Sequence, residues 1–141
     1  MSQAPEHAAS AAVRSIRVSA AVITDASGRL LLVRKAGTTA FMQPGGKPER
    51  GETAAETLIR ELAEEVGLLL TEDDLDALGE FTAHAANEPG FLVIADVFRV
   101  DIGDQQPVPD AEIEELRWIT RAEASTLDVA PLAATYFLPG E

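Results

Sequence analysis

The sequence of 141 residues contains no cysteine and no long uncharged apolar stretch. Without cysteine the chain has no disulfide, no thiolate metal ligand and no cysteine nucleophile, and it suits the reducing environment of the cytoplasm, where we expect the protein to reside. No segment reaches the roughly 18 consecutive apolar residues that a transmembrane helix needs. We therefore expect no membrane partner.

Basic residues are also scarce. The chain has 11 lysines and arginines against 24 aspartates and glutamates, which gives a formal net charge of −13. No basic stripe is available to replace the counterions of a nucleic acid, so we expect no nucleic-acid partner. An acidic protein still binds a polyphosphate when metal ions supply the positive charge.

The composition suits one compact domain, because 46% of the residues are hydrophobic. Residues 1–15 are rich in alanine and serine and lack the basic start and apolar centre of a signal peptide. We expect a disordered leader over residues 1–15 and a folded domain over residues 16–141.

Apolar patterning and turn residues predict strands on both sides of one central helix. The expected elements are a hairpin of Ile16–Thr24 and Leu30–Arg34, strands at Leu78–Ala85, Phe91–Val100 and Glu114–Ile119, a helix opened by the capping box of Thr120 and Glu123, and a last helix over Pro131–Phe137. This order indicates a layered α+β or α/β domain.

The central helix has clear start and stop signals. Thr53 is followed three positions later by Glu56, which forms a capping box, and Gly67 follows the last apolar position. A helix from Thr53 to Val66 is therefore predicted.

Three carboxylates share one flank of this helix. At about 100° per residue, Glu61, Glu64 and Glu65 lie together beside the apolar stripe. Like charges at these spacings repel one another, and a hard divalent cation bound by oxygen atoms would neutralise them. The preceding Gly45-Gly46 pair lets the backbone approach a bound ligand closely. A solvated acidic helix face is the alternative interpretation.

Residues 46–68 follow the pattern G-x5-E-x7-R-E-U-x-E-E-x-G-U, in which U is apolar. This pattern resembles the signature of the Nudix hydrolases at every fixed position. The resemblance implies an α/β Nudix fold, an α/β/α sandwich around a mixed β-sheet. It also implies an enzyme that hydrolyses acid anhydrides in phosphorus-containing compounds with Mg²⁺ or Mn²⁺.

The resemblance also assigns roles to residues. The metal ligands would be Glu61, Glu64 and Glu65, with Glu64 and Glu65 as the core pair, and the Gly45 carbonyl as a further ligand. Arg60 and Glu52 would be orienting residues, and Glu52 is also a candidate for the metal shell. The general base would be Glu61 or Glu65 of the motif, or a carboxylate of the loop before Trp118, for which Glu112 is the first choice and Glu115 the second.

The implied substrate is a small nucleotide with a diphosphate group. Arg34, Lys35, Lys47 and Arg50 are candidates for phosphate contacts, and Phe41, Phe81, His84, Asn87 and Phe91 for contacts with the base or sugar. Residues 83–86 lack the proline and tyrosine marks of two Nudix subgroups, which leaves the MutT-like subgroup acting on nucleoside triphosphates, including oxidised ones. The alternatives are an ADP-ribose or nucleotide-sugar pyrophosphatase and a non-catalytic nucleotide-binding regulatory module. A homodimer is also compatible with the family.

Overall fold

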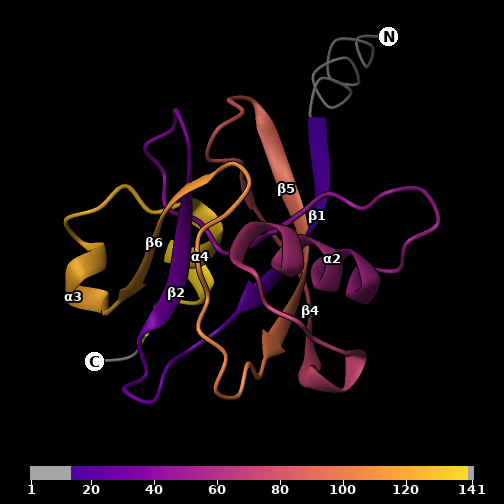
Figure 1. Ribbon diagram of the computed structural model, residues 1–141. Coiled ribbons are helices and arrows are strands. Elements are labelled where there is room, and N and C mark those ends of the chain that lie inside the picture. Colours follow the sequence, from indigo (N-terminus) through magenta and orange to yellow (C-terminus); the bar gives the residue numbers. More distant parts are fainter. Residues whose placement is uncertain (1–13, 140–141) are drawn as a thin grey trace, which may run out of the picture.

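The computed structural model describes residues 14–139, and its elements are arranged as shown in Figure 1. The strands are β1 (Arg14–Val22), β2 (Leu30–Lys35), β3 (Gly45–Gly46), β4 (Leu75–His84), β5 (Phe91–Val100) and β6 (Ile113–Ile119). The helices are α2 (Ala54–Val66), the 3₁₀ helix η1 (Glu72–Asp74), α3 (Arg121–Ala124) and α4 (Pro131–Tyr136). Within residues 14–139, no helix has the length and apolar character needed to cross a bilayer.

The first strand begins earlier than the sequence indicates. Most of the expected leader, residues 1–13, lies outside the described residues. Arg14 and Ser15 belong to β1, where they pair with Phe91 and Leu92 of β5. The boundary expected after residue 15 is therefore moved, because pairing with a distant strand extends β1 beyond its own apolar pattern.

A mixed four-stranded sheet has the order β3-β1-β5-β4. β1 runs parallel to β5 over its whole length, whereas β3 pairs antiparallel with β1 and β4 antiparallel with β5. β2 and β6 form a separate antiparallel pair. The mixed sheet expected from the resemblance is present.

The prediction that the first two strands pair as a β-hairpin is wrong, because β1 and β2 belong to different sheets. The turn itself forms, since the Asp25 side chain accepts hydrogen bonds from the backbone N–H groups of Ser27 and Arg29. After a single bridge between Thr24 and Leu30, however, the strands separate. The reason is non-local, because β1 pairs with β3 and β5 while β2 pairs with β6.

Helix α2 has the predicted bounds and caps. Thr53 is its N-cap, both hydrogen bonds of the capping box with Glu56 are made, and Gly67 ends the helix in the left-handed conformation with φ 70°. Leu58, Leu62 and Val66 are fully buried. The apolar stripe thus holds α2 against the sheets.

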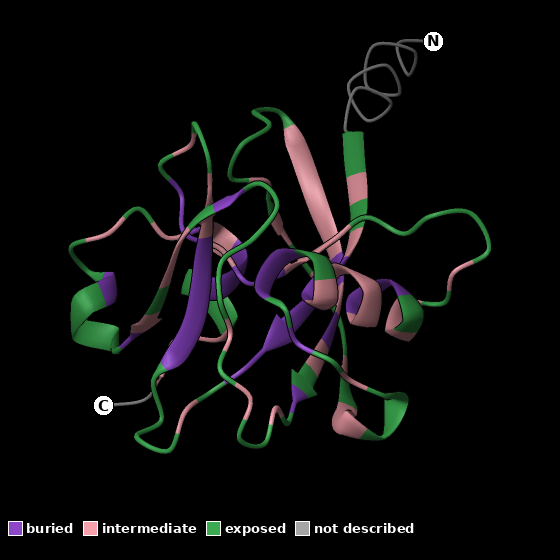
Figure 2. Cartoon of the chain, in the orientation of Figure 1, coloured by how far each residue is buried: buried purple, intermediate pink, exposed green. Residues whose placement is uncertain are grey.

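Two apolar clusters lie on opposite faces of the sheets, which gives three layers (Figure 2). One cluster joins α2 to Ala21, Ile23, Leu31 and Val33. The other joins α3 and α4 to Ala20, Val22, Leu30 and Leu32. Alternate residues of β1 and β2 therefore face different helices, as the two-residue period of a strand requires.

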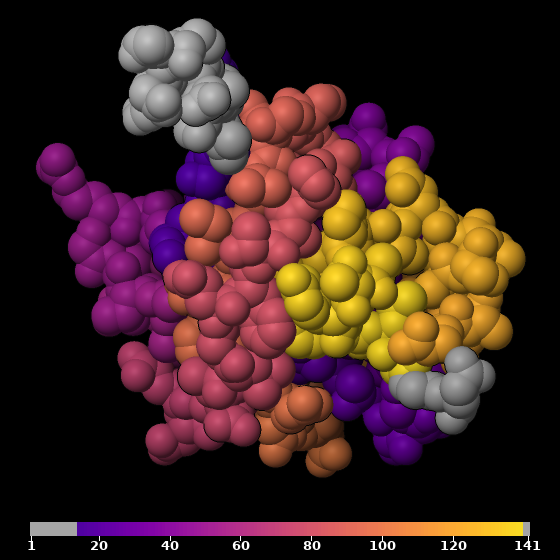
Figure 3. All heavy atoms as spheres, turned by 180° about the vertical axis from the view of Figure 1, so that it is seen from behind, coloured from indigo at the N-terminus to yellow at the C-terminus, as the bar shows by residue number. Residues whose placement is uncertain are grey.

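The C-terminal helix α4 lies against the edge strand β4, as the view from behind shows (Figure 3). The Tyr136 hydroxyl donates a hydrogen bond of 3.1 Å to the Thr82 carbonyl. The Phe81 ring packs edge-on against the rings of Tyr136 and Phe137, at centroid distances of 5.0 and 4.9 Å. These contacts fix α4 over one end of the mixed sheet.

Candidate active site

The glycine turn brings the backbone directly against a glutamate of α2. A Cβ atom on Gly45, whose φ is 149°, would lie 2.0 Å from the Ser19 carbonyl oxygen of β1. A Cβ atom on Gly46 would lie 2.4 Å from the carboxyl carbon of Glu61. A side chain at Gly45 would thus clash with backbone, and one at Gly46 would displace the Glu61 carboxylate, which in this structure lies directly against the glycine turn.

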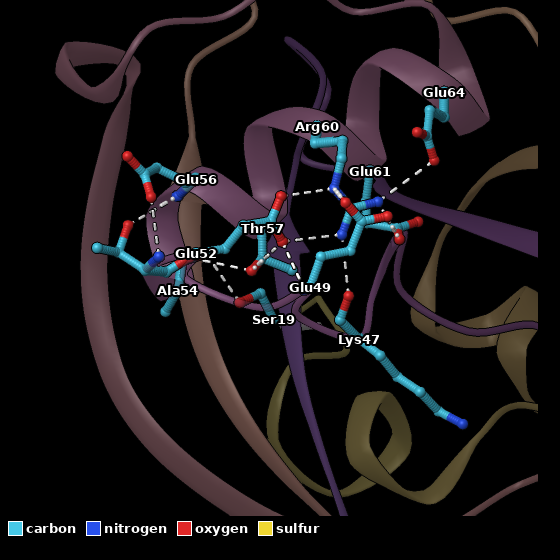
Figure 4. Close-up of polar contacts among 11 residues, drawn as sticks. Ser19, Lys47, Glu49, Glu52, Ala54, Glu56, Thr57, Arg60, Glu61 and Glu64 are labelled. Carbon is cyan, nitrogen blue, oxygen red and sulfur yellow. Dashed lines mark hydrogen bonds and ion pairs between the residues drawn. The ribbon is translucent and has the colours of Figure 1, made fainter.

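Arg60 orients this glutamate through a network that Figure 4 shows. Its Nε lies 2.6 Å from Glu52, one Nη lies 2.9 Å from Glu61, and the other donates to the Lys47 carbonyl oxygen at 3.0 Å. The hydrogen bond from Arg60 lowers the pKa of Glu52 to about 2, with help from the Glu49 amide and Thr57. Glu52 is therefore an anion that positions Arg60, and Arg60 in turn positions Glu61.

Glu65 is the most deeply buried carboxylate of the motif, with 3% of its surface exposed. The Gly45 N–H donates a hydrogen bond of 3.1 Å to its Oε1. Burial is the main cause that raises the pKa of Glu65 to about 7; the neighbouring Glu61 and Glu112 carboxylates act in the same direction, and Gly45 and Lys35 oppose them. Burial also raises the pKa of Glu61. Positive charge at this place would stabilise both groups in their ionised form.

A cavity of about 580 Å³ opens beside these carboxylates. Its polar end contains the glycine turn, three glutamates and two lysines: Gly45, Gly46, Glu61, Glu65, Glu112, Lys35 and Lys47. Its other end contains aliphatic side chains of β1, β5 and α4 together with the turn that follows β4. The cavity thus joins a charged end, suited to phosphates and cations, to an apolar end.

The loop before β6 holds Glu112 in this cavity by backbone contacts. The Asp110 N–H donates to the Glu65 carbonyl oxygen at 2.8 Å, and the Ala36 N–H donates to the Glu112 carbonyl oxygen at 2.9 Å. The loop is thereby tied both to the last turn of α2 and to the end of β2. Glu112 reaches the same space as Glu61 and Glu65 although it lies far from them in the sequence.

Two of the predicted metal ligands lie outside the cavity. The Glu64 side chain is 55% exposed, and its nearest ionic partner is Arg60 at 3.4 Å. Glu52 is occupied by Arg60 and Thr57. Glu61, Glu65 and Gly45 are the predicted ligands that the fold brings together at the cavity.

The predicted substrate contacts divide in a similar way. The candidates that line the cavity are Lys35, Lys47, His84 and Asn87, whereas Arg34, Arg50, Phe41, Phe81 and Phe91 do not line it. Of the neighbours Arg34 and Lys35, Lys35 is the one that faces the cavity. Adjacent residues of a strand face opposite sides of the sheet. Because β2 has a bulge between Arg34 and Lys35, the sequence pattern does not predict which of the two faces the cavity.

Arg34, Phe41 and Phe81 have structural partners outside the cavity. Arg34 forms an ion pair of 3.2 Å with Glu115 and donates to the Thr38 carbonyl oxygen. Phe41 is 5% exposed and lies beneath the guanidinium groups of Arg34 and Arg117. Phe81 belongs to the ring cluster under α4. Glu115, the second choice for the general base, pairs with Arg34 and Arg117, and the hydrogen bond from Arg117 is the main cause that lowers its pKa.

The carboxylates fit a divalent cation by their chemistry. Among residues 14–139, no three acidic or histidine side chains stand preassembled as a complete metal-binding set. Glu61 and Glu65 nevertheless bring hard oxygen ligands to backbone that carries no side chain, and their raised pKa values show that a positive charge is favourable there. Glu64, one helical turn from Glu61, can supply a further carboxylate from the solvent side.

The chain is similar to known proteins in both sequence and structure. The family model described as NUDIX domain matches residues 13–138. A MutT-like protein of Streptomyces ambofaciens is 30% identical over 125 residues, which cover 89% of this chain and 75% of that protein.

Two solved structures resemble the whole domain. The solution structure of the E. coli ORF135 protein superposes with a TM-score of 0.65 at 25% identity, covering 88% of this chain and 86% of the other. The crystal structure of the MutT protein from Methanosarcina mazei gives a TM-score of 0.67 at 24% identity, covering 84% and 86%. The second similarity concerns the fold alone.

Proposed function

The chain belongs to the Nudix family of hydrolases acting on phosphorus-containing anhydrides, and we propose that it cleaves a phosphoanhydride bond of a nucleoside triphosphate with Mg²⁺ or Mn²⁺. The similarity to a MutT-like protein supports this substrate class. Oxidised nucleoside triphosphates belong to the same class. The observation that carries the proposal is the convergence of Glu61, Glu65 and Glu112 with the glycine turn at one end of a cavity.

Nudix hydrolases generally use divalent cations. Here Glu61, Glu65 and the Gly45 carbonyl would hold the ion, with Glu64 and Glu52 as the further candidates. When bound, such an ion neutralises phosphate charge and acidifies a water molecule. The Arg60 network keeps Glu61 in place, and Glu65 is held by the Gly45 N–H.

Lys35 and Lys47 supply positive charge from the chain itself. Both line the cavity at the end where the carboxylates lie. Lys35 also counteracts the raised pKa values of Glu61 and Glu65, which places its charge within electrostatic range of both. The two lysines are suited to hold the phosphates of the substrate against the glycine turn.

Glu112 is our choice for the general base. Its carboxylate would take a proton from the water whose oxygen attacks phosphorus, while the bond between that phosphorus and the bridging oxygen breaks and the second phosphate leaves. The backbone contacts of Asp110 and Ala36 hold Glu112 at the cavity without using its side chain. Glu61 and Glu65 are the alternatives within the motif.

Substitution distinguishes these roles. We expect Glu61→Gln and Glu64→Gln to lower kcat by on the order of 100-fold or more if both hold the cation. Glu112→Gln should lower kcat by a similar factor with little change in KM. Glu114→Gln is the matched control, because Glu114 is exposed and does not line the cavity.

The substrate is tested by a panel of nucleoside triphosphates, oxidised nucleotides, ADP-ribose and nucleotide sugars, with the phosphate products identified. Preferred cleavage of ADP-ribose or a nucleotide sugar would replace the triphosphate assignment. If these compounds bind and stabilise the protein but no phosphate is released, in Mg²⁺ or in Mn²⁺, the chain would instead be a regulatory binding module. Unchanged turnover in both Glu61→Gln and Glu64→Gln would reject the metal site.

A further inference from the structure

Gln43 has an unusual place in the cavity wall. It directly precedes the Pro44-Gly45-Gly46 turn, lines the cavity and is 7% exposed. Its Nε2 donates a hydrogen bond of 3.1 Å to the Ala21 carbonyl oxygen of β1. Its Oε1 is the buried side-chain atom that has no hydrogen-bond partner among the residues described, 14–139.

The orientation of this amide is fixed by its surroundings. Exchanging the oxygen and the nitrogen would place Oε1 against the Ala21 carbonyl oxygen, and two acceptors repel each other. The nitrogen must therefore face Ala21, and the oxygen must face away from it. An unpaired buried acceptor destabilises the protein, and a ligand that supplies the donor removes this cost.

Apart from the His84 imidazole, the described residues at the apolar end of the cavity offer no aromatic surface. Its walls are formed by Ile16 and Val18 of β1, Val93 of β5 and Leu132 of α4, and no residue of the described chain that lines the cavity is Phe, Tyr or Trp. Aliphatic walls hold a flat or puckered ring without selecting it by stacking. Selection must then come from the polar groups of the described lining residues, among which Gln43 is the buried one with an unpartnered atom.

We propose that the Gln43 Oε1 accepts a hydrogen bond from a donor on the group attached to the diphosphate, and so makes the enzyme prefer substrates that carry this donor. This proposal rests on the function proposed above. The donor is an N–H of a base or a hydroxyl of a sugar. In the free protein the oxygen is covered, so binding requires a small shift of neighbouring side chains, as is common at interfaces.

Pairs of substrates that differ by one donor test the proposal. GTP is compared with ITP, and ATP with purine ribonucleoside triphosphate, since in each pair the second compound lacks one exocyclic amine. Ribonucleotides compared with 2′-deoxyribonucleotides test the sugar hydroxyl. We expect wild-type kcat/KM to favour the donor-bearing member of at least one pair by about 10-fold or more.

The Gln43→Met variant should reduce that preference to less than about 3-fold, because methionine has a similar shape but no comparable acceptor. Gln105→Met is the matched control: the Gln105 amide is paired on both sides with the backbone of Leu69, outside the cavity. Its preference should equal that of the wild type. Thermal unfolding establishes that both variants are folded.

Two outcomes would overturn the proposal. One is a wild-type enzyme that hydrolyses the panel with no preference within any pair, a result that does not depend on the variant folding. The other is a wild-type preference that Gln43→Met leaves intact. Calorimetric titration of the same pairs replaces kinetics if turnover is absent; absence of both binding and turnover would reject the proposed function together with this inference.

Discussion

At the scale of single residues, burial of the ionised Glu65 carboxylate destabilises the folded protein. Burial raises the pKa of its carboxyl group to about 7 from an ordinary value of 4.5. The neutral form is thus favoured in the folded, metal-free protein. Relative to a neutral side chain, stability is unaffected below the ordinary pKa and decreases as the pH rises through 4.5 toward 7 and above.

We therefore expect Glu65→Gln to stabilise the metal-free protein at alkaline pH. A shift of this size corresponds to about 3 kcal/mol, fully developed above pH ~8 and absent below pH ~4. Urea unfolding in the presence of EDTA, at a series of pH values, measures the difference. Glu64→Gln is the control, because that side chain is mostly exposed and should change stability little. Equal pH dependence in wild type and Glu65→Gln would contradict the burial argument.

Gly46 is the second residue with a sharp prediction. In Gly46→Ala, the new methyl group would lie 2.4 Å from the carboxyl carbon of Glu61 and 2.7 Å from both of its oxygens. We expect a loss of stability of roughly 1–3 kcal/mol and a large loss of activity, because Glu61 has to move.

A double-mutant cycle separates the clash from a general backbone effect. Adding Gly46→Ala to a Glu61→Ala background should cost much less stability, since the clashing carboxyl group is gone. Denaturant unfolding of the four proteins gives the coupling energy. Equal costs in both backgrounds would show that Gly46 does not hold Glu61 in place.

At the scale of elements, local capping residues determine where α2 begins and ends, and α2 in turn positions the glutamates of the site. Thr53 caps the helix, and the Ser19 hydroxyl of β1 donates a hydrogen bond of 2.8 Å to the Ala54 carbonyl oxygen in its first turn. Thr120 makes the same capping box with Glu123 in α3, which has only four residues. The two caps differ in what they support.

Thr53→Ala should lower the global free energy of unfolding by about 1 kcal/mol, because the whole of α2 packs on the core. Thr120→Ala should mainly increase local fraying of α3, with a smaller global effect. Urea unfolding measures the global values, and amide hydrogen exchange over residues 121–124 measures the local one. Equal global losses in the two variants would refute this difference.

The elements that sequence patterns predict well are those with local determinants. Helix α2 and strand β5 have the bounds that capping residues and an apolar run indicate. The hairpin of β1 and β2 is wrong because partner choice depends on β5 and β6, which lie far away in the sequence. Sequence patterns fail for the Phe41 side chain for the same reason. Phe41 is buried next to a β-bridge with Val129, which lies far away in the sequence.

At the scale of the whole molecule, both the chain and its cavity carry an excess of acidic residues. The formal net charge is −13, and the polar end of the cavity contains Glu61, Glu65 and Glu112 against two lysines. The motif glutamates could be recognised in the sequence by their helical spacing. The cavity that they share with Glu112 and Gln43 could not, because it is assembled by sheet pairing and by the loop contact between Asp110 and α2.

Divalent cations should therefore stabilise the protein beyond a general salt effect. At a concentration of 100 times the dissociation constant, a bound ion adds about 2.7 kcal/mol. We expect Mg²⁺ and Mn²⁺ to raise Tm in thermal unfolding, whereas Na⁺ at matched ionic strength should raise it less. The increment should be lost in the Glu61→Gln variant. The same increment from Na⁺ would mean that the ions only screen surface charge.

Separate stretches of the chain line the cavity. One stretch can therefore be replaced by the equivalent segment of another protein while the others are kept. The glycine turn with Lys47, the α2 residues Glu61 and Glu65, and Glu112 line the end where the anhydride would be cleaved, whereas the turn after β4 and the helix α4 contribute other lining residues. Replacing the turn or α4 with that of a homologous fold should retarget the enzyme while the chemistry is retained. Directed evolution of new activities would accordingly begin at residues 84–88 and 130–133, not in the motif.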